Sequence, residues 1–555
     1  MAVAVAQEHA PQGGDLRSLD DVYEETLVIL FRLLFLAYAE DRGLLPYATN
    51  ATYRRNSLKQ LARELADRAN RGASYERAET HALWSATTQL FEAVDKGNDE
   101  WGVPAYNGGL FSPDSAISPA GGAIEALRLT DAELTPVLTN LLNERDAEGV
   151  FAPIDFRSLS VRDFGTLYEG LLESSLSVAT SDLALDARRH YVPATEGREV
   201  EVQEGTIYFH NRSGARKSSG SYFTRDFAVE HLLEGALEPS LTGHLERLAS
   251  LLASGREDEA ASAFFDFRCA DLAMGSGHFL VAAVDRIEKR LAEFLDEHPI
   301  AMVEAELDRL RAAATLHLGD SATAYEIERR QLLRRQVARR CVYGVDRNHI
   351  AVELARLSLW IHTFVPGLPL SYLDHNLVQG DSLTGIGTID EVVTYLGAQD
   401  ARKQAKHGQG SIFETLIVGW LEEAQQPLLR LARATDTTRA ELREVREAAD
   451  EARRRAEPVR LLCDLACAMR RGEVAAFMSG GTGKAIEEHP QRALAESAAC
   501  ELDSLHFPVV LPEVFLRARP GFDCLVGNPP WEKLQVEEHS RGERGHRRSS
   551  QPTTF

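Results

Sequence analysis

The chain has 555 residues, enough for about three or four domain-sized units. Its 44% hydrophobic and 26% charged residues are typical of a globular protein, and without a secretory apolar segment or an apolar run of about 18 residues we expect a cytoplasmic location. The formal net charge of −23 excludes a protein that coats nucleic acid through its overall charge, but it allows a local basic cleft.

The six cysteines do not form a metal-binding pattern. Only Cys463 and Cys467 are close in sequence, and no second pair or neighbouring histidine completes a zinc set. We therefore expect no metal site, and free thiols as in a reducing compartment.

The N-terminal part is predicted to be a helical domain over residues 1–200, beginning with about 20 Ala-, Gln- and Gly-rich residues that we expect to be disordered. Apolar residues between Tyr23 and Leu45 recur at helical spacing, which indicates a core helix. Helical patterns continue over 55–145 and again over 164–173. No catalytic constellation stands out, so a scaffold role is favoured for this part.

A hairpin-like segment over 200–209 leads into a basic, hydroxyl-rich loop over 216–224. Thr224 ends that loop and precedes a helical pattern over 227–237, so its first interpretation is a helix N-cap. The alternative is that the exposed N–H groups of the same helix start receive a carboxylate.

A strand, a glycine turn and a helix follow one another near residue 270. The strand over 267–270 ends in Asp271, and Gly275 and Gly277 flank a serine before an apolar helix. Two glycines let the backbone approach a ligand closely. The pattern is typical of the first βα turn of a doubly wound sheet, where such folds bind nucleotides, although Leu280 replaces the last glycine of the full fingerprint.

Two further strands lead to acidic residues. The strand over 341–346 ends in Asp346, precedes a helix over 350–361, and places its acid to accept hydrogen bonds from both ribose hydroxyls of a nucleotide. A third strand, beginning at Leu377, leads to Asp381. A single strand-end aspartate is usually a turn former, but three in succession indicate a shared site.

Two long helical insertions separate these strands. Residues 285–340 contain the basic run 329–340, interpreted as a solvated helix face, with a DNA-backbone contact as the alternative. Residues 390–505 predict an inserted antiparallel helical pair or coiled segment. The glycines of 480–484 lack the spacing of a P-loop and indicate a simple loop.

The last apolar stretch, residues 522–526, predicts a buried strand that runs into the turn Asn528, Pro529, Pro530 and Trp531. The prolines stiffen the turn and orient its carbonyls outward. Rigid acceptors beside an aromatic face suit a planar base with an exocyclic amine. From these four residues alone, a structural Pro-rich turn is an equal alternative.

Five segments in this order carry a family resemblance: Gly-Ser-Tyr-Phe-Thr at 220–224, Asp-Leu-Ala-Met-Gly-Ser-Gly at 271–277, Gly-Val-Asp at 344–346, Gly-Asp-Ser-Leu at 380–383 and Asn-Pro-Pro-Trp at 528–531. Together they resemble adenine-specific (N6) DNA methyltransferases, in particular the large methylases of Type IIG restriction–modification and BREX-like phage-exclusion systems. The resemblance implies an α/β fold with a Rossmann-like methyltransferase sheet over 201–535, helical insertions, and a disordered tail over 536–555.

The resemblance also implies S-adenosylmethionine as cofactor and double-stranded DNA as partner. By motif, the cofactor would be held by Tyr222 and Thr224 at its methionine end, Asp271, Gly275 and Gly277 around its amino acid and sugar, Asp346 at its ribose and Asp381 at its adenine amine. The target N6 amine would meet Asn528 and the carbonyl of Pro529 in the turn that Pro530 stiffens, and Trp531 would stack on the target base.

Methylases of this group continue well beyond the Asn-Pro-Pro-Trp turn, so we expect this chain to lack a C-terminal target-recognition part and to leave a sheet edge exposed. Two alternatives stay open. The chain could be a catalytically incomplete scaffold or cofactor-binding partner for other defence-system subunits. It could also methylate another planar amine, such as cytosine N4 or a protein glutamine.

Overall fold

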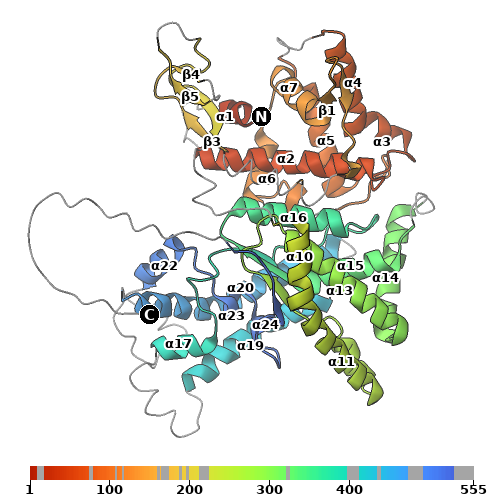
Figure 1. Ribbon diagram of the computed structural model, residues 1–555, viewed down its shortest axis with the longest axis vertical. Helices are drawn as coiled ribbons and strands as arrows, with labels where there is room; N and C mark the ends of the chain where they lie inside the picture. Colours follow the sequence, from red (N-terminus) through yellow and green to blue (C-terminus); the bar gives the residue numbers. More distant parts are fainter. Residues whose placement is uncertain are drawn as a thin grey trace, which may run out of the picture.

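A computed structural model gives the fold of the protein (Figure 1). The residues that it describes are 1–8, 18–73, 79–106, 109–115, 118–158, 163, 174–186, 190–195, 199–211, 224–319, 326–396, 412–433, 439–472 and 492–529. Four predicted features lie outside them: the helix over 164–173, the loop over 216–224 except Thr224, the glycine loop over 480–484 and the tail over 536–555.

A four-stranded parallel sheet lies at the centre of the molecule. In spatial order its strands are β10 (Cys524–Leu525), β7 (Cys269–Asp271), β8 (Val342–Asp346) and β9 (Leu377–Gln379). Cys269 is in register with Cys524 on one side and with Val342 on the other. Because helices make up most of the remaining chain, the fold is mixed α/β and mostly helical, and it is compatible with a methyltransferase.

The two inner strands, β7 and β8, are buried because helices cover both faces of the sheet. Cys269, Val342 and Leu377 point into the large core that includes helices α13 (His278–Glu297), α15 (Arg329–Arg340) and α16 (His349–Thr363). Ala270 and Tyr343 point the other way, onto α23 (Phe507–Val510) and α24 (Pro512–Phe515). Burial on both faces explains why these strands are almost continuously apolar.

The predicted strand ends are confirmed at Asp271 and Asp346, which are the last residues of β7 and β8. The prediction for 522–526 was too long, because β10 has two residues and lies at the edge of the sheet. Cys524 and Val526 are buried as predicted, whereas Leu525 points the other way and is 55% exposed. Asp523 precedes β10, and its Oδ2 accepts a hydrogen bond from Arg268 N at 2.9 Å.

Helices α10 (Asp226–Leu232), α11 (Glu238–Ala253), α12 (Glu257–Ala263) and α14 (Ala301–Leu318) surround the sheet together with α13, α15 and α16, and a short π-helix at Leu233–Leu237 joins α10 to α11.

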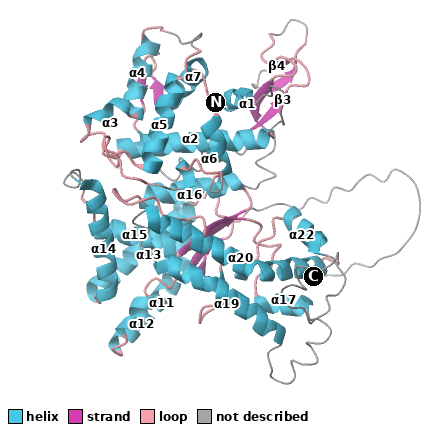
Figure 2. Ribbon diagram, turned by 180° about the vertical axis from the view of Figure 1, so that it is seen from behind, coloured by secondary structure: helices cyan, strands magenta, loops and turns pink. Residues whose placement is uncertain are grey.

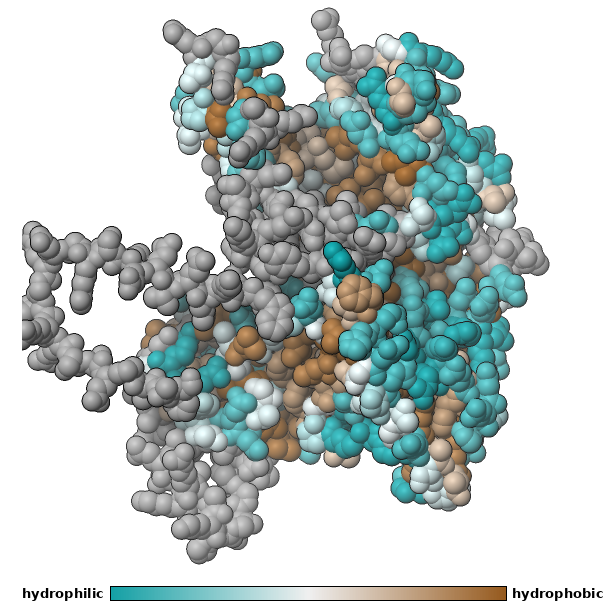
Figure 3. All heavy atoms as spheres, viewed as in Figure 1, coloured by the Kyte–Doolittle hydropathy of each residue, from teal (hydrophilic) through white to brown (hydrophobic). Residues whose placement is uncertain are grey.

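The interpretation of the basic run over 329–340, which forms α15, as a solvated face was wrong. Arg329, Arg330, Arg334 and Arg340 form ion pairs with acidic residues of α13 and α14: Asp285, Glu288, Asp296, Glu304 and Glu306. The side of the molecule that carries α13 and α14 is mostly hydrophilic (Figure 3).

The N-terminal helices form a layer above the sheet region: α2 (Leu19–Asp41), α3 (Ala51–Asn56), α4 (Leu58–Asn70), α5 (Ala82–Lys96), α6 (Pro119–Ala126) and α7 (Asp131–Leu142), with short 3₁₀ turns at Gly109–Phe111 and Phe156–Ser158. The long α2 lies against α16, where Phe35 meets Phe364 at 5.8 Å between ring centroids. The predicted disorder of the first residues was wrong for α1 (Ala2–Glu8), because Val5 and Ala6 are buried and the helix packs against α2.

Three short antiparallel strand pairs also belong to this part of the described chain. They are β1 (Asn143–Arg145) with β2 (Phe151–Pro153), β3 (Ser174–Val178) with β6 (Ile207–Asn211), and β4 (Leu183–Leu185) with β5 (Tyr191–Pro193). The hairpin predicted over 200–209 is therefore wrong. Its second half is β6, which pairs with the distant β3, and Val202 bridges to Leu183.

The predicted helical pair in the second insertion is confirmed. Helices α19 (Ile412–Arg433) and α20 (Arg439–Arg470) pack along each other, and α17 (Ile389–Leu396) and α22 (Arg492–Glu501) contact α20 (Figure 2). Their shared core includes Ile417, Leu421, Leu462 and Cys463.

Among the helices that the structure describes, none combines the length and the apolar character needed for crossing a bilayer. Within the same residues, no three His, Cys, Asp or Glu side chains gather as metal ligands. The six cysteines are unbridged.

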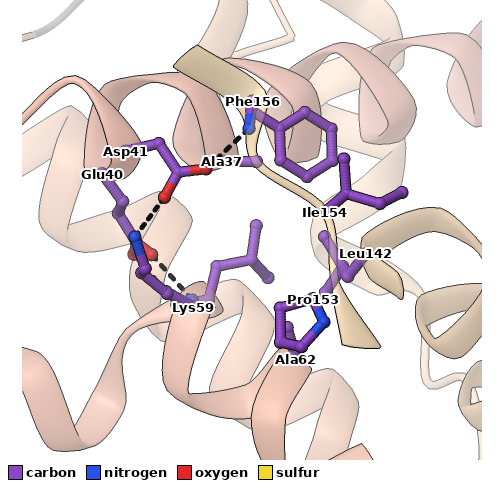
Figure 4. Close-up of a pocket in the computed structure, with 10 residues that line it drawn as sticks. Ala37, Glu40, Asp41, Lys59, Ala62, Leu142, Pro153, Ile154 and Phe156 are labelled. Carbon is purple, nitrogen blue, oxygen red and sulfur yellow. Dashed lines mark hydrogen bonds and ion pairs between the residues drawn. The ribbon is translucent and has the colours of Figure 1, made fainter. Parts of the chain in front are cut away.

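A small cavity of about 20 Å³ lies between α2, α4 and β2 (Figure 4). Glu40 lines it and accepts hydrogen bonds from the Tyr53 hydroxyl at 2.8 Å and from the backbone N–H groups of Leu58 and Lys59 at 2.9 and 2.7 Å. Burial raises the pKa of Glu40 to about 7, although these donors favour the charged form. The carboxylate thus fastens the first turn of α4 to α2, and we assign it a structural role.

This buried acid makes stability depend on pH. Because the folded state holds the Glu40 proton up to about pH 7 and the unfolded chain releases it near 4.5, the contribution of Glu40 to stability is fully present below about pH 4.5 and is lost as the pH rises to about 7. Glu40→Gln should reduce the loss in unfolding free energy between pH 5 and 8 by about 2 to 3 kcal/mol, since each unit of pH between the unfolded and folded pKa values contributes roughly 1.4 kcal/mol. Urea denaturation at both pH values measures this, with the exposed Glu144→Gln as control. An unchanged pH dependence in the Glu40 variant would contradict the assignment.

Candidate functional site

The carboxyl ends of the four parallel strands meet at one edge of the sheet, and this edge holds the acids singled out from the sequence. Asp271 and Asp346 end β7 and β8, and Asp381 lies two residues after β9. Gly527 and Asn528 follow β10 two and three residues after its last residue. Ligands of open parallel sheets bind in the crevice outside this edge.

The Asp271 side chain lies against the backbone of Gly527, in the turn that follows β10. Its carboxylate is almost fully buried, its Oδ1 accepts from Ala273 N at 3.0 Å, and its Oδ2 has no hydrogen-bond partner among the described residues. A Cβ placed on Gly527 would lie 2.6 Å from Asp271 Oδ1, and Gly527 has φ +152°. Only glycine therefore lets the backbone pass this close to the acid.

The glycine turn between β7 and α13 is fastened to the end of β8. Gly275 has φ +54° and donates its N–H to Asp346 Oδ2 at 2.9 Å, while Asn348 N donates to Asp346 Oδ1 at 2.8 Å. Gly277 has φ +83°, and a Cβ there would approach Ala355 Cα of α16 to 3.2 Å. Both glycines adopt the left-handed conformation that the turn requires.

Burial shifts the titration of both acids. It raises the pKa of Asp271 to about 7, and the neighbouring Asp346 carboxylate pushes it in the same direction. Burial also raises the pKa of Asp346, against the hydrogen bonds from Asn348 and Gly275. Two adjacent buried acids with shifted pKa values favour a ligand that brings positive charge or hydrogen-bond donors.

Asn528 and Thr224 come together from segments 304 residues apart. Asn528 Nδ2 donates to Thr224 Oγ1 at 3.2 Å. The prediction that Thr224 caps the following helix was wrong, because α10 begins at Asp226 and Arg225 is its N-cap residue. The start of α10 nevertheless adjoins the glycine turn, since His278 Nε2 lies 3.3 Å from Asp226 Oδ1. Tyr222, Pro530 and Trp531 lie outside the described residues.

Asp381 already has intramolecular partners. Its Oδ1 accepts from Leu383 N at 2.8 Å and Thr384 N at 3.2 Å, and its Oδ2 lies 3.4 Å from Nε of Arg347. Sequence reasoning missed Arg347, although its position directly after Asp346 places it at this edge. It also missed the role of Gly527, for which a glycine directly before the Asn-Pro-Pro turn was the available signal.

A comparison with protein-family models matches the part of the chain that contains three of the four strand ends at this edge. Residues 340–553 match the Eco57I restriction-modification methylase family. The part that matches the Eco57I methylase model contains β8, β9 and β10 with Asp346, Asp381 and Asn528, whereas Asp271 and the glycine turn precede it. This match supports a restriction–modification methylase and hence a role as a DNA methyltransferase. Neither the curated proteins nor the solved structures gave a match.

Proposed function

We propose that the protein transfers a methyl group from S-adenosylmethionine to the N6 amine of an adenine in duplex DNA, within a restriction–modification or phage-defence system. The observation that carries this proposal is the convergence of Asp271, Asp346 and Asp381 with the turn of Asn528 at one sheet edge. In this proposal residues 201–535 form a Rossmann-like methyltransferase domain, and residues 1–200 form a helical domain beside it.

The residues at this edge fit S-adenosylmethionine. Asp271 Oδ2 is a buried acceptor without a hydrogen-bond partner in the described part of the chain, which suits the ammonium group of the cofactor's methionine end. Among the described residues, no atom lies within 4 Å of the position that a Cβ on Gly275 would take, which supports room for a ligand beside the turn. When bound, the cofactor supplies a methyl group made electrophilic by its sulfonium.

Thr224, Asp346 and Asp381 would supply the remaining contacts with the cofactor. Thr224, with Tyr222 before it, would hold the methionine end, and Asp346 would accept from the ribose hydroxyls through lone pairs that Gly275 and Asn348 do not occupy. Asp381 would accept from the adenine amine once Arg347 moves away from its Oδ2.

Asn528 and Pro529 would act on the target base. The lone pair of the N6 amine is delocalised into the ring, so the nitrogen is a poor nucleophile. The Asn528 amide oxygen and the Pro529 carbonyl would accept its two N–H bonds and favour a pyramidal nitrogen aimed at the methyl group. The cofactor would supply the methyl group as its C–S bond breaks, Asn528 and the Pro529 carbonyl would hold the nitrogen in line with that bond, and the methylated amine would release one proton to solvent.

The target base must leave the duplex to reach this turn, at a cost of a few kcal/mol. Stacking on Trp531 would offset part of that cost. The basic run of α15 is a poor candidate for holding the DNA backbone, because its arginines are paired with Glu288, Glu304 and other acids. The phosphate contacts are therefore expected from other basic residues.

Cofactor binding tests the proposal through Asp346. Asp346→Ala removes the acceptor of two backbone N–H groups and the proposed ribose contact, so isothermal titration should show at least tenfold weaker S-adenosylmethionine binding, equivalent to about 1.4 kcal/mol. The exposed Asp99→Ala serves as control, and thermal unfolding verifies the fold. Parent protein without measurable affinity, or a variant equal to the parent, would count against the proposal.

A further inference from the structure

We propose that the buried pair His506 and Asp464 positions residues 381–386, called the post-β9 loop below, and thereby sets the orientation of the Asp381 carboxylate. The inference rests on the proposed function, in which Asp381 receives the adenine of the cofactor. It gives the second helical insertion a role in cofactor selectivity, since Asp464 belongs to α20.

The post-β9 loop lies against residues 502–507, which run beside it. Asp381 N donates to Asp503 O at 2.7 Å, Leu505 N donates to Asp381 O at 3.3 Å, and Phe507 N donates to Ile386 O at 3.0 Å. A Cβ on Gly385 would lie 1.8 Å from Leu505 O, so the two segments are in direct backbone contact. The position of the loop therefore follows the position of residues 502–507.

His506 ties these two segments to α20. Its Nδ1 accepts from Ile386 N at 3.1 Å, so that nitrogen carries no proton, and its Nε2 therefore donates to Asp464 Oδ1 at 2.8 Å. His506 and Asp464 are 3% and 2% exposed. Water cannot readily replace these partners at such burial, so one neutral tautomer is held in one orientation.

Helix α20 holds the loop at a second point. The Arg470 guanidinium donates to Thr384 O, and Cys467 Sγ lies 3.5 Å from the same carbonyl. Asp464 itself is fixed by Arg460, whose Nη1 lies 2.6 Å from its Oδ2. One face of α20 thus contacts the loop at Thr384 and, through His506, at Ile386.

The contacts of α20 and His506 with the post-β9 loop affect Asp381 through the backbone of Leu383 and Thr384. Its Oδ1 accepts from the N–H groups of Leu383 and Thr384, so the direction of the carboxylate depends on where these two residues lie. Among the described residues, the hydrogen bonds of His506 and Asp464 do not reach Asp381 directly. They act through the loop and are positioning residues.

Selectivity for the purine amine tests this role. S-adenosylhomocysteine carries an amine at the position where S-inosylhomocysteine carries a carbonyl, and only the amine donates to a carboxylate. His506→Phe removes both the acceptor for Ile386 N and the donor to Asp464. We expect the ratio of the two dissociation constants to fall about tenfold in this variant. His506→Gln, which keeps an acceptor and a donor, should retain most of the parental ratio.

Arg455→Gln is the matched control, because Arg455 lies on α20 but contacts Glu423 and Glu451 rather than the loop. It should keep the parental ratio. If His506→Phe does not fold, Asp464→Asn replaces it, and a reduced ratio is again expected because the buried charge that orients Nε2–H is lost. A parental ratio in the folded variant overturns the inference. Parent protein that binds neither ligand contradicts the proposed function instead.

Discussion

Asn528→Ala is expected to lower methyl transfer to DNA at least a hundredfold while S-adenosylmethionine affinity stays within about twofold. Loss of one preorganised hydrogen-bond partner at a reacting centre typically costs a factor of about 10² to 10³ in rate. The hydrogen bonds that the described residues make with Asp271 and Asp346 do not involve the Asn528 side chain, so this variant leaves these two cofactor acids in place. Steady-state incorporation of tritium from labelled cofactor into DNA gives the rate, and calorimetry gives the affinity.

Thr224→Val separates the catalytic contribution of Asn528 from its contact with Thr224. Asn528 Nδ2 donates to Thr224 Oγ1, so the alanine variant also removes that bond. Valine at 224 removes the same bond and leaves the amide in place, and we expect a loss of roughly tenfold at most, the equivalent of one lost hydrogen bond. Transfer is compared at saturating S-adenosylmethionine, because Thr224 is also proposed to hold the methionine end of the cofactor. Equal losses in the two variants under this condition would show that Asn528 acts through its contact with Thr224 rather than on the target amine.

Gly527→Ala is the second variant with a large expected effect. A methyl group at this position would lie 2.6 Å from Asp271 Oδ1, and the φ of +152° is one that alanine rarely adopts. Either the turn after β10 or the Asp271 carboxylate must move, and both belong to the proposed site. We expect transfer to fall more than a hundredfold and cofactor affinity to fall as well, measured in the same two assays.

Gly521→Ala is the matched control for this variant. Gly521 precedes β10 and also has a positive φ, of +96°, but in the described part of the chain no atom lies within 4 Å of the position that its Cβ would take. The two variants therefore share backbone strain and differ in the collision with Asp271. Equal losses of activity in both would attribute the effect to strain in β10 rather than to the approach of Gly527 to Asp271.

The parts of the site that follow from local pattern were predictable. β7 and β8 end at Asp271 and Asp346 because each acid closes a short apolar run, and Gly275 and Gly277 have the backbone conformation expected of a glycine turn. The contact of Gly527 with Asp271 was not predictable, because these residues are 256 positions apart and meet only through the parallel pairing of β10 with β7.

Tertiary partners also explain the wrong predictions. The arginines of α15 look solvated in sequence, and only the packing of α13 and α14 brings Glu288 and Glu304 to them. Helix α1 has a composition typical of a mobile terminus, and burial of Val5 gives it a stabilising surface that an isolated helix of that length lacks. The partner of β6 is likewise distant in sequence, so no local signal distinguishes it from a hairpin.

The most direct test of the central claim is mass spectrometry of nucleosides from duplex DNA incubated with the protein and S-adenosylmethionine that carries a trideuterated methyl group. We expect trideuterated N6-methyl-2′-deoxyadenosine with the parent protein and its absence with Asn528→Ala. DNA without label would contradict methyl transfer by this chain, and label on cytosine would contradict adenine as the target.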